Sequence, residues 1–131
     1  MKERTTLDHD LKHTTFSSLI LIDTDGVEAR EMVDFLESFA ERFSYTLYHI
    51  RLGCYLLRDH DPFPNHARFE SELEILLSES SESLTLGISL ERQDALEKAE
   101  KALTFAKRHG RRMIAYSRMI ENALMAQADT L

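Results

Sequence analysis

The segment that decides the fold is SSLILIDTDG, residues 17–26. Its apolar run, which begins at Phe16 and ends at Ile22, is short and is closed by turn-forming residues, a pattern typical of a buried strand. Two carboxylates, Asp23 and Asp25, follow at once. Either they hold a metal for phosphate chemistry, or they mark a strand-to-helix turn in which an Asp side chain accepts local backbone N–H groups.

Helical and extended patterns alternate on both sides of this strand. Apolar residues recur three and four apart in four segments, which predicts helices at residues 4–13, 28–43, 66–78 and 91–109. Short apolar runs predict further strands at residues 45–50, 54–57, 84–90 and 112–116. A tight hairpin at Leu52-Gly53 joins the first two of these strands, and a loop is expected at residues 59–65 because both prolines lie there.

These elements predict one small mixed domain. Their order, (α)βαββαβαβ(α), indicates the α/β class, as an α+β two-layer sandwich with the helices packed largely on one side of the sheet. A chain of 131 residues suits a single domain, which we place at residues 1–117. Residues 118–131 are expected to form a helical tail or linker.

Composition excludes several classes of protein. With 43% hydrophobic residues and no apolar run near the roughly 20 that a spanning helix needs, neither disorder nor a membrane contact is expected. The net charge of −7 repels phosphate backbones, so nucleic acid is not an expected partner. The single cysteine, Cys54, excludes an internal disulfide framework and fits a reducing cytosol, so we expect a cytoplasmic protein.

Four stretches resemble, in order, the motifs of a GGDEF domain across residues 4–117. They are LILIDTDG at 19–26, YHIRLG at 48–53, LTLGIS at 84–89 and AKRHGR at 106–111. The resemblance implies a nucleotide-cyclase-like fold, with a ferredoxin-like βαββαβ core and an additional C-terminal strand. It also implies diguanylate cyclase ancestry: active members condense two GTP molecules into cyclic di-GMP across a dimer, with metal ions that neutralise the phosphates.

The same resemblance assigns roles to four residues. Asp23 matches the family's metal-binding Asp at a strand end, and the carbonyl of Thr24 would be a second ligand. Lys107 and Arg111 match a phosphate clamp. The residues by themselves leave a second interpretation of the two cations open, because positive charge at the end of a helix compensates the helix dipole and is solvated there.

Two departures from the family pattern concern the metal and the nucleotide. After Arg51-Leu52-Gly53 the chain continues as Cys54-Tyr55, so the turn lacks the Gly-Asp-Glu that supplies a carboxylate. Glu28 stands where the family has a lysine, and a carboxylate there would repel a triphosphate. No catalytic residue is therefore assigned, and no cofactor is expected: Mg²⁺ and GTP would bind only if activity were retained.

The sequence thus predicts a catalytically inactive GGDEF-like domain with a regulatory or assembly role in bacterial cyclic di-GMP signalling. The expected partners are an EAL-type or sensor domain in a longer chain, or a second copy in a homodimer. Two alternatives stay open. One is a module that senses GTP or another guanine nucleotide, and the other is a weakly active diguanylate cyclase.

Overall fold

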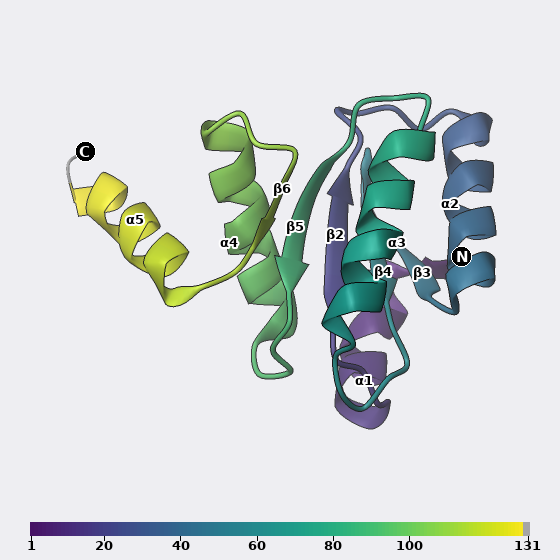
Figure 1. Ribbon diagram of the computed structural model, residues 1–131, viewed down its shortest axis with the longest axis horizontal. Helices are drawn as coiled ribbons and strands as arrows, with labels where there is room; N and C mark the ends of the chain where they lie inside the picture. Colours follow the sequence, from purple (N-terminus) through teal and green to yellow (C-terminus); the bar gives the residue numbers. More distant parts are fainter. Residues whose placement is uncertain (130–131) are drawn as a thin grey trace.

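The structure is a computed structural model that describes residues 1–129, with side chains described to residue 126 (Figure 1). Within that range six strands form one sheet in the order β1-β3-β4-β2-β5-β6. The strands are β1 (Lys2–Glu3), β2 (Leu19–Asp23), β3 (Thr46–Arg51), β4 (Cys54–Arg58), β5 (Thr85–Ser89) and β6 (Met113–Ala115). The helices are α1 (Arg4–His13), α2 (Arg30–Phe43), α3 (His66–Glu79), α4 (Ala95–Arg108) and α5 (Arg118–Asp129).

The strand predicted from SSLILIDTDG lies in the interior of this sheet. β2 runs antiparallel to β4 on one side and to β5 on the other, while the outer pairs β1–β3 and β5–β6 are parallel. Every residue from Leu19 to Ile22 is fully buried. β2 begins at Leu19 rather than at Phe16, because the backbone N–H groups and hydroxyls of the two intervening serines bond to the carboxylate of Asp59.

Helices cover both faces of the sheet, which corrects the prediction that they pack largely on one side. Ile20 and Ile22 belong to the core cluster of α2 and α3, whereas Leu19 and Leu21 belong to that of α1 and α4. Figure 1 shows α3 on the face turned toward the viewer. The physical reason is that an unbroken apolar run puts apolar side chains on both faces of a strand, and both need cover. The mixed α/β class is confirmed, with three layers in place of two.

Most predicted elements are present, with shifted ends. α4 begins at Ala95 instead of Glu91, because the hydroxyl of Ser89 accepts the Glu91 N–H at 3.3 Å in a local turn. Asp94 then has a left-handed φ of 51°, which cannot lie inside a right-handed helix. The two-residue strand β1 was not predicted, since so short a segment carries no periodic pattern.

α4 lies close against β5 because Gly87 has no side chain. A methyl group at Gly87 would overlap the carbonyl oxygen of Ala99 and would lie 2.5 Å from the backbone nitrogen of Leu103. β5 runs antiparallel to β2, and α4 returns along β5. The last turn of α4 therefore lies beside the end of β2, where Lys107 contacts Asp23.

α5 packs on α4 at one end of the molecule (Figure 1). Ile120 is buried, and the carboxylate of Glu121 accepts from Lys101 Nζ at 2.9 Å and from the Tyr116 hydroxyl at 2.8 Å. α5 spans residues 118–129 of the segment for which the sequence predicts a helical tail or linker, and residues 130 and 131 lie outside the described residues. None of the helices within the described residues has the length and apolar composition of a membrane-spanning segment.

Candidate functional site

The candidate site lies where the C-terminal end of β2, the tip of the β3–β4 hairpin and the last turn of α4 meet. In the register of the sheet, Asp23 at the end of β2 stands opposite Cys54 at the start of β4. The chain then turns through Asp25 and Gly26, which have left-handed φ angles of 55° and 81°. This turn leads the chain away from the sheet toward α2 and leaves Asp23 at its corner.

The hairpin tip packs directly on that turn. The carbonyl of Gly53 accepts the backbone N–H of Thr24 at 2.8 Å, and the hydroxyl of Thr24, which donates to the carbonyl of Val27 at 2.6 Å, lies 3.0 Å from the same Gly53 oxygen. A methyl group on Gly53 would lie 2.5 Å from Cα of Gly26, so the two backbones are in contact. Both glycines have positive φ, a conformation that a residue without Cβ adopts at no steric cost. The contact leaves no space for a ligand between the hairpin tip and the turn.

Glu28 strengthens the same contact from the loop before α2. Its oxygen Oε1 accepts the Gly53 N–H at 2.7 Å and lies 2.7 Å from Nε2 of His49. The Gly53 N–H, and after it His49, lower the pKa of Glu28 below its usual value because they favour the charged carboxylate. Glu28 therefore ties the hairpin to the loop.

Asp23 is bonded through both of its carboxylate oxygens. Oδ1 accepts the backbone N–H of Asp25 at 2.7 Å, which confirms the turn interpretation of Asp23. Oδ2 accepts from Nζ of Lys107 at 2.7 Å. The Asp23 side chain is 15% exposed, whereas the Lys107 side chain is 47% exposed. The hydrogen bond to Asp23 raises the pKa of Lys107 above its usual value.

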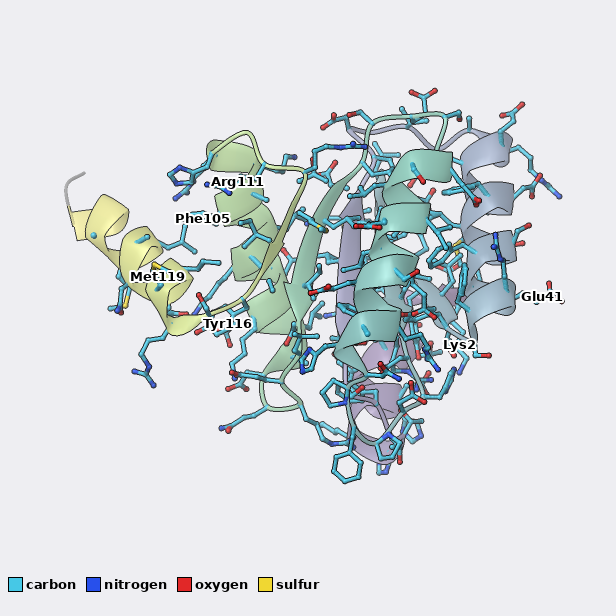
Figure 2. The ribbon with its side chains drawn as sticks, in the orientation of Figure 1. Lys2, Glu41, Phe105, Arg111, Tyr116 and Met119 are labelled. Carbon is cyan, nitrogen blue, oxygen red and sulfur yellow. The ribbon has the colours of Figure 1, made fainter. Side chains whose placement is uncertain are left out.

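Arg111 does not take part in this cluster. It lies in the turn after α4, and Figure 2 shows it at the end of that helix. Its backbone N–H donates to the carbonyl of Ala106 at 2.8 Å, and its side chain is exposed. The two residues of the predicted phosphate clamp therefore differ. The side chain of Lys107 is bound to Asp23, whereas the exposed guanidinium of Arg111 makes no bond to another described residue.

The donors at this site do not fit a divalent metal ion. Mg²⁺ requires a near-octahedral set of oxygen ligands. Each oxygen of Asp23 accepts one hydrogen bond, and the carbonyl of Thr24 accepts the N–H of Val27 at 3.2 Å, so these three oxygens alone could supply only part of such a set. Leu52 and Gly53 at the hairpin tip carry no carboxylate. Among the side chains that the structure describes, up to residue 126, no group of three or more His, Cys, Asp or Glu is placed to hold a metal.

The sequence does not reveal how these residues connect. From the sequence, Lys107 can be interpreted as part of a phosphate clamp or as a solvated charge at a helix end. Neither interpretation includes the ion pair with Asp23. From the sequence, Glu28 is interpreted as a charge that repels triphosphate. The hydrogen bond that it accepts from Gly53 is not predicted. For the ion pair a topological signal exists, since a helix that returns along a strand antiparallel to β2 must end where β2 ends. For Glu28 we find no signal in the sequence.

Comparison with known proteins finds similarity in the fold. No protein-family model matches the chain, and no curated protein matches it. The GGDEF domain of the PA2567 protein from Pseudomonas aeruginosa superposes with a TM-score of 0.62 and 19% sequence identity, over 88% of this chain and 94% of that one. The coiled coil and GGDEF domain of DgcB from Caulobacter crescentus, solved in complex with c-di-GMP, gives a TM-score of 0.56 and 15% identity, over 87% of this chain and 80% of that one. The chain has the fold of GGDEF domains, as the sequence resemblance predicts.

Proposed function

We propose that this chain, which has the GGDEF fold, is a non-catalytic domain of cyclic di-GMP signalling. It acts through contacts with another domain or with a second copy of itself. Similarity of fold to two GGDEF domains, one of them solved with c-di-GMP, supports the connection to this signalling system. The geometry at the end of β2 supports the absence of catalysis.

One observation carries the proposal: the hairpin tip is packed on the turn after β2. In the cyclases that the sequence resembles, the metal ions are held between a strand-end Asp and this hairpin. Here Gly53 contacts Gly26 at that place, and Glu28 bonds to the Gly53 N–H. Without metal ions to neutralise the phosphates, the main stabilisation of a phosphoryl-transfer transition state is lost.

A product assay tests the absence of catalysis. The purified chain is incubated with GTP and either Mg²⁺ or Mn²⁺, and cyclic di-GMP is quantified by mass spectrometry. An active diguanylate cyclase is the positive control, and the Asp23→Ala variant is the negative control. We expect no product from the wild-type chain. Product that depends on Asp23 would contradict the proposal and favour a weakly active cyclase.

The partner is part of the same proposal. An EAL-type or sensor domain in a longer chain is one candidate, and the coiled coil that accompanies the GGDEF domain in the DgcB structure is consistent with a multidomain setting. A second copy is the other candidate. Light scattering over a range of concentrations separates them, because a mass that stays monomeric at all concentrations leaves only a different domain as the partner. A cytoplasmic location accompanies the proposal.

A nucleotide-sensing module is the second candidate function, and the exposed Arg111 side chain favours it. Titration calorimetry with GTP, with and without Mg²⁺, tests this candidate. Binding that disappears in the Arg111→Ala variant would support it. If millimolar GTP gives no heat of binding, sensing through this site is excluded.

A further inference from the structure

Asp23 is a mostly buried carboxylate, and it needs a positive partner. Only 15% of its side chain is exposed, so the charged group has lost much of its hydration. The backbone N–H of Asp25 satisfies one oxygen. The ammonium of Lys107 satisfies the other and supplies the only whole positive charge bonded to this carboxylate within the described residues.

A lysine suits this position better than a metal ion does. An ammonium group has three donors and no fixed coordination geometry, whereas Mg²⁺ demands a near-octahedral set of ligands that the surrounding residues do not provide. Lys107 also lies in the last turn of α4, where the helix dipole favours a cation. Asp25 adds a second negative charge nearby, which contributes to the raised pKa of Lys107.

A second ion pair fastens the same helix to the hairpin. Arg51, at the end of β3, donates to both carboxylate oxygens of Glu100 in α4, at 2.7 and 3.3 Å. The two pairs have opposite polarity: an arginine of the hairpin binds a glutamate of the helix, and an aspartate of the strand binds a lysine of the helix. Together with the Gly53 bonds, they connect the turn, the hairpin tip and α4 to one another.

We propose that Lys107 is a built-in counter-cation, which takes the position of a divalent ion beside Asp23 and holds these three parts together without metal or nucleotide. The inference rests on the proposed non-catalytic function and deepens it. The contacts between the turn, the hairpin tip and α4 therefore do not depend on a bound metal ion.

Binding of Mn²⁺, followed by the electron paramagnetic resonance of the free ion, tests the role of Lys107. The variants are Lys107→Met and Lys12→Met, which remove the same charge; Lys12 is exposed on α1 and serves as the matched control. We expect Lys107→Met to bind Mn²⁺ about tenfold more tightly than the wild type, with water as most of the ion's ligands, because Oδ2 of Asp23 becomes accessible and the repelling charge beside it is gone. The Lys12→Met variant should match the wild type. The gain should disappear in Lys107→Met combined with Asp23→Asn.

Equal Mn²⁺ affinity in Lys107→Met and Lys12→Met would overturn the inference. If Lys107→Met does not fold, nuclear magnetic resonance of the unaltered chain decides. Mn²⁺ should then broaden the amide signals of Asp23 and Asp25 no more than that of the exposed Glu82, and selective broadening at Asp23 would refute the counter-cation. These results are independent of the product assay: cyclic di-GMP formation concerns the proposed function, whereas the Mn²⁺ comparison concerns Lys107.

Discussion

Gly53 connects the hairpin to the rest of the candidate site through its backbone. Its carbonyl accepts the backbone N–H of Thr24, its N–H donates to Glu28, and its Cα is in contact with the backbone of Gly26. No other residue type fits here, because φ is +69° and a Cβ would collide with backbone that cannot move aside. The contact that leaves no space for a ligand between the hairpin tip and the turn therefore depends on Gly53, a residue without a side chain.

Replacing Gly53 by alanine tests this contact. We expect Gly53→Ala to lower the free energy of unfolding by about 3 kcal/mol, because a strained φ and a steric overlap add together. Gly110→Ala is the matched control: its φ is +62°, but no atom lies within 4 Å of the added methyl group. It should cost only about 1 kcal/mol. Urea unfolding measures both, and equal losses would show that the Gly26 contact contributes nothing.

Asp10 makes stability depend on pH. Its carboxylate accepts from the Tyr48 hydroxyl at 2.6 Å and from Lys2 Nζ at 2.9 Å, and these partners, Tyr48 first, lower the pKa of Asp10 below 3.8. A depressed folded-state pKa stabilises the fold above the unfolded pKa and loses that contribution as pH falls through the folded one. We expect Asp10→Asn to be about 2 kcal/mol less stable than the wild type at neutral pH.

The difference in stability between the wild type and Asp10→Asn should shrink steadily below pH about 4, because the aspartate becomes protonated and the asparagine does not titrate. Urea unfolding of both proteins across this range measures it. Parallel loss of stability in the two proteins would show that a different group controls the acid response.

At the scale of the element, α5 is the part least integrated into the fold. Among its side chains described to residue 126 only Ile120 is buried. Figure 2 shows Phe105 on α4 near α5, on which Met119 lies. Met119 is 78% exposed. Met125 is exposed as well, so α5 buries fewer of its described apolar side chains than the four helices that cover the sheet.

Ending the chain after Ser117 tests whether residues 1–117 fold as a unit. We expect the shortened chain to unfold cooperatively, with a loss of about 2 kcal/mol that corresponds to the burial of Ile120. The Ile120→Ala variant of the full chain is the control and should account for most of that loss. Circular dichroism during urea unfolding gives both values. A broad, non-cooperative transition in the shortened chain would show that α5 is part of the folding unit.

Periodicity predicts where the elements lie but not where they end. α1 and the hairpin are found at their predicted places, because apolar spacing and a Leu-Gly turn are local signals. The start of α4 and the two-residue β1 are not found in this way. Both depend on contacts with distant or irregular backbone: a left-handed Asp94, and pairing of Lys2 with Tyr48 across the sheet.

At the scale of the whole molecule, the sheet is a middle layer with two helices on each face. The neighbouring residues Ile20 and Leu21 point to opposite faces, and both are 0% exposed. A two-layer sandwich would have left one of them against solvent. The third layer explains how a chain with two short edge strands buries its central strand completely.

Paired substitutions in β2 test the three-layer architecture. We expect Ile20→Ala and Leu21→Ala each to cost about 3 kcal/mol, since each opens a cavity in a separate core. Leu52→Ala is the control: Leu52 is 75% exposed, and its loss should change stability by less than about 0.5 kcal/mol. Urea unfolding again gives the values. A cost for Leu21→Ala similar to that of Leu52→Ala would mean that the face under α1 and α4 is not a packed core.

The sequence by itself determined the order of the elements other than β1, the buried strand that ends at Asp23, and the absence of a carboxylate from the hairpin turn, because each depends on adjacent residues. Only the tertiary structure decided that helices cover both faces, that Lys107 pairs with Asp23, and that Glu28 and Gly53 close the site. These contacts join residues up to 84 positions apart. Local spacing carries no information about such distances, and only the packing of α4 and the hairpin against β2 brings those groups together.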